Sequence, residues 1–89
     1  MIISTDAIVL KTIKYGDSSI ICRLFTRDLG KIVVMAKGAW RPKNIAGPIL
    51  EPMNHIHVEY YNKNSRDIQI VKNVSLINQL SYLRSHLEK

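Results

Sequence analysis

A basic segment that contains the only tryptophan of the chain is the first candidate for chemistry. It reads Ala36-Lys37-Gly38-Ala39-Trp40-Arg41-Pro42-Lys43. Lys37, Arg41 and Lys43 can neutralise phosphates. The indole of Trp40 can stack on a base. No acidic residue occurs from Gly30 to Leu50, so no carboxylate of this stretch competes with a polyanion. Cations beside a planar ring predict a site for unpaired nucleic acid. The alternative is that these loop cations are only solvated and bind no partner.

Two interpretations remain open for Trp40 and also for the cations Arg23 and Lys31. A lone tryptophan in a small barrel is often a core residue, so base stacking and core packing both remain possible for Trp40. Arg23 and Lys31 fall on the strands expected beside the basic segment, where they serve either as rim cations of the same site or as structural residues. Lys31 and Lys37 share one face of a largely apolar strand with Val33 between them. That face either binds nucleic acid or is covered by the segment that follows.

No set of residues predicts an enzyme. His55 and His57 share a strand face, but only Glu59 lies near them in sequence, so we expect no metal and no cofactor. Cys22 alternates with apolar neighbours and is expected to pack in the core. Ser18 has no histidine near it in sequence and no recognisable oxyanion element, and the chain has no phosphate-binding glycine loop.

Composition is typical of one small soluble domain. Its charge indicates a polyanionic partner, either nucleic acid or an acidic protein tail, and a basic surface that only maintains solubility is the alternative. The chain has 89 residues and a net charge of +6. Residues 1–50 hold eight Lys/Arg and three Asp, which gives +5, so most of the excess lies in the half with the basic segment. The longest apolar run, Ile32 to Ala36, is too short to cross a bilayer, and no signal peptide is visible. A single cysteine excludes an intrachain disulfide and fits the cytoplasm.

Residue patterns predict an all-β fold with a helical end. Period-2 alternation and short Gly/Asp turns predict strands at 4–14, 19–26, 31–37, 55–61 and 68–74. The first three should form an antiparallel meander, and a crossover with a helical turn near 48–51 should lead to the last two. The alternation slips in the last strand, which indicates a bulge. The order predicts a five-stranded OB-fold barrel, with a small SH3-like barrel as the competitor.

The end of the chain is predicted to be an amphipathic helix. Ser75 is a plausible N-cap, and Leu76, Leu80, Leu83 and Leu87 fall on one helical stripe. We therefore expect a nucleic-acid-binding barrel over residues 1–75 and a helix over residues 76–89. An apolar stripe without a stop signal suggests a helix that docks on another element, as expected for the N-terminal domain of a longer chain.

Four ordered segments resemble a known family. They are Thr5-Asp6-Ala7-Ile8-Val9-Leu10, Tyr15-Gly16-Asp17-Ser18-Ser19, Leu24-Phe25-Thr26-Arg27-Asp28-Leu29-Gly30-Lys31 and Ala36-Lys37-Gly38-Ala39, followed by Arg41-Pro42-Lys43. Together they resemble the N-terminal domain of the bacterial DNA repair and recombination mediator RecO over roughly residues 1–80. The family's basic positions correspond to Lys37, Arg41, Lys43, Lys31 and Arg23. The position of Trp40 is commonly basic in this family, so this chain exchanges one phosphate contact for a ring.

The resemblance implies an OB fold followed by a helical domain, so the predicted helix over residues 76–89 would lead to a helical domain that is missing here. It implies binding of single- and double-stranded DNA and annealing of complementary strands in the cytoplasm, at the nucleoid. It also implies work with RecR-like and RecA-like proteins and with single-strand binding protein, and no membrane. Two alternatives remain, a protein-interaction module and an RNA-binding barrel. An acidic peptide competitor would separate the first from DNA binding, and comparison of RNA with DNA would separate the second.

Overall fold

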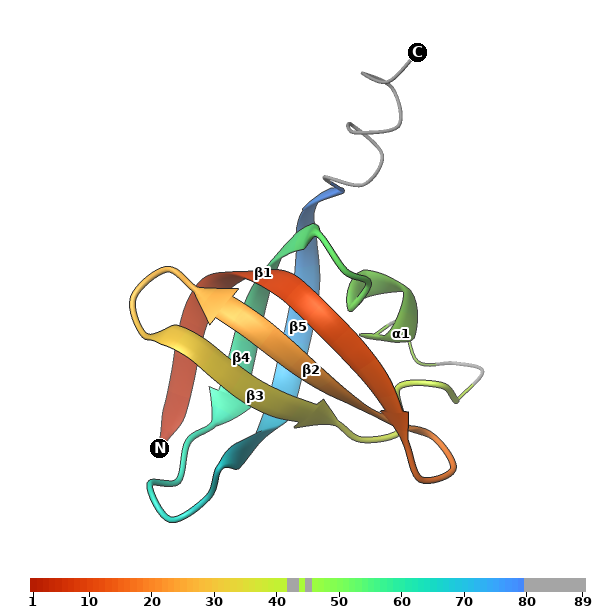
Figure 1. Cartoon of the computed structure of the whole chain (residues 1–89), viewed down its shortest axis with the longest axis horizontal. Helices are drawn as coiled ribbons and strands as arrows, with labels where there is room; N and C mark the ends of the chain where they lie inside the picture. The colour runs from red at the N-terminus through yellow and green to blue at the C-terminus, as the bar shows by residue number, and fades with distance from the viewer. Residues whose placement is uncertain (42–43, 45, 80–89) are drawn as a thin grey trace.

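Five strands and one short helix make up the structure, a computed structural model that describes residues 1–41, 44 and 46–79 (Figure 1). In chain order they are β1 (Ile2–Tyr15), β2 (Ser19–Thr26), β3 (Gly30–Ala36), α1 (Ala46–Ile49), β4 (Asn54–Tyr61) and β5 (Ile68–Gln79). The strands form a closed barrel in the order β1-β2-β3-β5-β4. This order, with α1 between β3 and β4, confirms the predicted OB fold.

Barrel closure depends on the length of β1. Its residues 2–8 pair with β4 and its residues 7–15 pair with β2, both antiparallel, so one strand borders two neighbours. β3 and β5 close the opposite side through a short parallel ladder between Val33–Met35 and Ile68–Ile70. The turn between β2 and β3 is fixed by Thr26, whose hydroxyl donates to the Gly30 carbonyl oxygen (2.7 Å) and accepts from the Leu29 amide (2.9 Å).

Alternate residues of the strands fill the barrel, as the period-2 pattern predicts. Cys22 and Leu24 of β2 are completely buried, which confirms the core assignment of Cys22. Burial raises the pKa of the Cys22 thiol to about 12, so it packs as a small neutral side chain. Tyr60 is buried and Tyr61 is exposed, so one tyrosine of the pair belongs to the core, as expected from their opposite faces.

The last strand is longer than predicted. Two register shifts against β4, at Lys72 and Ile77, confirm a bulged strand. The predicted helix start at Ser75 is wrong, because β5 continues to Gln79, with Ser75 opposite His57 of β4. The leucine spacing is compatible with a helix, but cross-strand hydrogen bonding to β4 decides the conformation of residues 75–79. The rest of the predicted helix, residues 80–89, lies outside the described residues.

The crossover between β3 and β4 contains the expected helical turn, displaced toward the N-terminus. α1 begins at Ala46, whose amide donates to the Asn44 side-chain oxygen (2.8 Å). The helix lies at one end of the barrel, next to the loop that follows β3 (Figure 1). None of the helical segments in the described residues is long and apolar enough to span a membrane.

Candidate nucleic-acid interface

Three cations on three neighbouring strands line one hollow on the outside of the barrel. Lys11 of β1 pairs with Arg23 of β2, and Lys31 of β3 pairs with Phe25, two residues from Arg23 on the same face. The hollow has a volume of about 360 Å³ and is completed by Leu10, Ile32 and Val33. Among the described residues no carboxylate lines it, so the charges that a phosphate would meet there are positive. We call Lys11, Arg23 and Lys31 the basic hollow.

Lys11 is the member of the basic hollow that sequence reasoning missed. Thr5, Ala7 and Val9 point into the barrel, and strict alternation would send Lys11 inward with them. The register shifts between Val9 and Lys11, which leaves Leu10 as an extra residue. This bulge turns Lys11 to the outer face, beside Arg23. A lysine at a nominally buried position of a strand is the one sequence signal that could have revealed the bulge.

The loop after β3 holds the second group of predicted residues, Lys37, Trp40 and Arg41; Lys43 lies outside the described residues. We call residues 37–41 the Trp40 loop. The Trp40 amide donates to the Ser18 carbonyl oxygen (2.9 Å), and the Arg41 amide donates to the Gly38 carbonyl oxygen (3.0 Å). The first of these bonds docks the loop on the β1–β2 turn, and the second closes the loop on itself. The side chains of Lys37 and Arg41 remain exposed.

Trp40 is not a core residue. Its side chain is 49% exposed, whereas the preceding Ala39 is buried and closes the core at this point. The Lys14 Nζ lies 5.0 Å from the centroid of the indole ring, within the range of a cation–π interaction. The structure therefore excludes core packing for Trp40 and leaves it with the exposed ring that base stacking requires.

The predicted site residues form two separate groups. Lys31 lies at the start of β3 and Lys37 follows its end, so they are about 20 Å apart at roughly 3.3 Å per residue. Between the two groups the outer face is apolar, with Ile13, Ile21 and Met35 side by side in one cross-strand row. The structure thus brings Arg23 together with Lys31, but not with Lys37 or Arg41.

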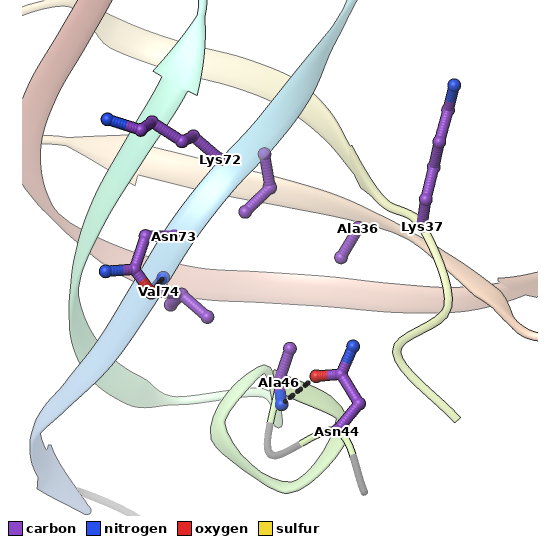
Figure 2. Close-up of a pocket in the computed structure, with 8 residues that line it drawn as sticks. Ala36, Lys37, Asn44, Ala46, Lys72, Asn73 and Val74 are labelled. Carbon is purple, nitrogen blue, oxygen red and sulfur yellow. Dashed lines mark hydrogen bonds between the residues drawn. The ribbon is translucent and has the colours of Figure 1, made fainter. Parts of the chain in front are cut away.

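A smaller hollow of about 120 Å³ lies where β3, β5 and α1 meet (Figure 2). Ala36 and Val74 line it, and Lys37 and Lys72 stand at its margin. Figure 2 shows the two lysine side chains extending in different directions, away from each other. They therefore do not form a convergent anion site.

Gly47 of α1 allows the helix to approach the Trp40 loop. A Cβ at this position would lie 2.8 Å from the Ala39 carbonyl oxygen and 3.5 Å from Cε3 of Trp40. Gly47→Ala should therefore lower the free energy of unfolding by about 1–3 kcal/mol, because a backbone oxygen must move. Urea unfolding measures this loss, and the Trp40 emission should shift as well. Pro48→Ala, at an exposed position of the same helix, is the control; an unchanged or stabilised Gly47→Ala chain would contradict the packing described.

His55 and His57 share the outer face of β4, where they lie opposite Ile8 and Asp6 of β1. His57 Nδ1 donates to Asp6 Oδ1 at 2.8 Å. Within the described part of the chain, no three His, Cys, Asp or Glu side chains are grouped to hold a metal ion. The hydrogen bond from His57 lowers the pKa of Asp6, assisted by the charges of His57, His55 and Arg27 and opposed by partial desolvation.

The Asp6–His57 pair predicts a loss of stability in acid. Because the pKa of Asp6 is lower in the folded chain than the ordinary 3.8, the pair stabilises the fold above that value. The contribution disappears as the pH falls through the lower folded-state pKa. The free energy of unfolding, measured with urea between about pH 5 and pH 3, should fall more for the natural chain than for Asp6→Asn. Asp67→Asn, in the β4–β5 turn, should behave like the natural chain; equal acid dependence of Asp6→Asn would contradict the assignment.

Comparison with known proteins gives a consistent set of relatives. The family described as "Recombination protein O N terminal" matches residues 1–80. The DNA repair protein RecO of Salinibacter ruber is 44% identical over 86 residues, which cover 97% of this chain and 33% of that protein. The RecO proteins of Pelodictyon phaeoclathratiforme and Chlorobaculum parvum are 40% and 42% identical over 77 residues, 86% of this chain and 30% of each relative. The chain therefore spans about a third of the length of these relatives.

Proposed function

We propose that this chain, which belongs to the RecO N-terminal family, is a non-enzymatic DNA-binding module of a DNA repair protein. The observation that carries the proposal is the basic hollow. Lys11, Arg23 and Lys31 come from three adjacent strands and face one cavity that no carboxylate of the described residues lines. Such a cluster serves no obvious packing purpose and matches the repeated charge of a phosphate backbone.

The mechanism combines phosphate neutralisation with contact to unpaired bases. The basic hollow binds phosphates at one end of β3, and Lys37 and Arg41 bind them at the other end. The apolar row of Ile13, Ile21 and Met35 and the exposed ring of Trp40 contact bases between and beside these cations. None of these contacts reads a base edge, so binding is independent of sequence. Strands held with their pairing edges free can meet a complement, and single- and double-stranded DNA both fit the cationic track.

Salt dependence tests this proposal directly. Phosphate contacts from the basic hollow and from Lys37 and Arg41 make five in all. They predict a slope of log K against log salt of about −3 to −4 for a single strand, since each contributes roughly −0.7. Fluorescence anisotropy of a labelled single-stranded oligonucleotide at several salt concentrations measures the slope. Equal affinity for RNA and DNA of the same sequence is expected. Absence of binding at low salt would overturn the proposal.

A protein-interaction surface is the second candidate, favoured by exposed apolar side chains on the same face. Ile13, Tyr15 and Phe25 are each about half exposed. Under this alternative an acidic peptide with apolar residues would bind the face. Strong peptide binding together with no DNA binding would select it.

The wider activity of the family is a proposal for the longer protein. We infer that this module acts in the cytoplasm, at the nucleoid, beside RecR-like and RecA-like proteins and single-strand binding protein, and that it helps to load a recombinase. Strand annealing by the 89-residue chain, followed with two complementary labelled strands, tests the part of this proposal that the barrel can perform alone.

A further inference from the structure

Lys14 and Trp40 form a contact that the basic track described above does not use. Lys14 lies near the end of β1, and its ammonium is 5.0 Å from the centroid of the Trp40 ring. Within the described part of the chain, no carboxylate lies within ion-pair distance of this ammonium. The ring is thus the only described partner of the Lys14 charge.

The ring is held in place by backbone contacts while half of it remains in solvent. The Trp40 amide is bonded to the Ser18 carbonyl oxygen, and Gly47 of α1 lets the helix approach the ring at Cε3. An indole that is fixed at its base and exposed over its ring loses little conformational freedom when another flat group stacks on it. Lys14, by contrast, has a flexible four-carbon stem and can swing from the ring face to its rim.

We propose that Lys14 and Trp40 form one subsite for a single nucleotide of an unpaired strand, in which Trp40 stacks on the base and Lys14 contacts the adjoining phosphate. The inference rests on the proposed DNA binding and adds Lys14 to the residues that contact DNA, beside the Trp40 ring. A phosphate attracts the ammonium more strongly than the ring does, so the lysine leaves the ring face as the base arrives. Binding of the base and binding of the phosphate are therefore coupled at this site.

The test compares a normal oligonucleotide with one of the same length that lacks its bases. Anisotropy of the labelled strands is measured with the natural chain, Lys14→Ala, Trp40→Ala and the milder Trp40→Phe. On the normal strand Lys14→Ala should weaken binding about 3- to 10-fold and reduce the salt slope by about 0.7. Trp40→Ala should weaken it about 5- to 100-fold, and Trp40→Phe less. On the abasic strand the effect of Trp40→Ala should vanish, while that of Lys14→Ala persists.

Lys72→Ala, which removes an exposed lysine of β5, is the matched control and should change affinity less than about twofold. If the natural chain binds DNA but neither Lys14→Ala nor Trp40→Phe differs from it, the subsite is overturned and the proposed function stands. If Lys14→Ala has no effect on the abasic strand, Lys14 only supports the ring, and its phosphate contact is overturned. If the natural chain binds neither strand, the proposed function fails together with the subsite.

Discussion

Replacing Lys11, Arg23 and Lys31 together by alanine is expected to weaken binding of single-stranded DNA by about 100-fold at roughly 0.1 M salt. Each cation that neutralises a phosphate contributes about 0.7 to the salt slope, so the triple variant should lose about 2 units of slope. The plots of log K against log salt for the natural chain and the triple variant are expected to meet at about 1 M salt. Their affinities then differ by about two powers of ten at roughly 0.1 M. All three side chains are exposed, so the fold should be retained.

Substitution of a lysine outside the basic hollow is the control for this result. Lys72→Ala should leave the salt slope within a few tenths of the natural value. Circular dichroism of the triple variant checks that the barrel is intact. An unchanged slope in a folded triple variant would mean that phosphates are bound elsewhere, and the basic hollow would lose its role.

Leu24→Ala should produce the largest loss of stability. Leu24 is completely buried on β2, which is paired on both edges, with β1 and β3. Truncation of a buried leucine costs about 2–5 kcal/mol through lost apolar burial and the cavity that remains. A chain of this size has a total stability of roughly 5–13 kcal/mol, so the variant should lose a large share of its free energy of unfolding.

Urea unfolding measures this loss, with Phe25→Ala as the matched variant. Phe25 is the next residue of the same strand but points outward and is 52% exposed, so its truncation should cost less than about 1 kcal/mol. Equal losses for the two variants would show that the barrel interior and its outer face are assigned wrongly.

The alternation of side chains was sufficient to predict much of the core. Buried positions of β2 and β4 follow a period of two, so the sequence alone could place Cys22 inside the barrel, together with one of the adjacent pair Tyr60 and Tyr61. Turn residues predicted the antiparallel meander, and the crossover predicted the OB order. These features depend on local pattern, which can be read directly from the order of residue types.

Features that depend on register could not be predicted in the same way. The bulge at Leu10 reverses the orientation of Lys11, and only the pairing of β1 with β2 shows it. A leucine repeat at helical spacing could not show that residues 75–79 would instead extend a strand along β4. The separation of Lys31 from Lys37 follows from their places at opposite ends of β3, whereas the pattern of charges alone suggested a single group.

Amide chemical-shift mapping of the ¹⁵N-labelled chain with a mixed-sequence single-stranded oligonucleotide tests the central claim most directly. We predict that the largest changes fall on the outer face of β1, β2 and β3, around Lys11, Arg23 and Lys31, and on the Trp40 loop. The outer face of β4, around His55 and His57, should change little. Changes concentrated on β4, or no changes at low salt, would contradict the assignment of the β1–β2–β3 face as a DNA-binding surface.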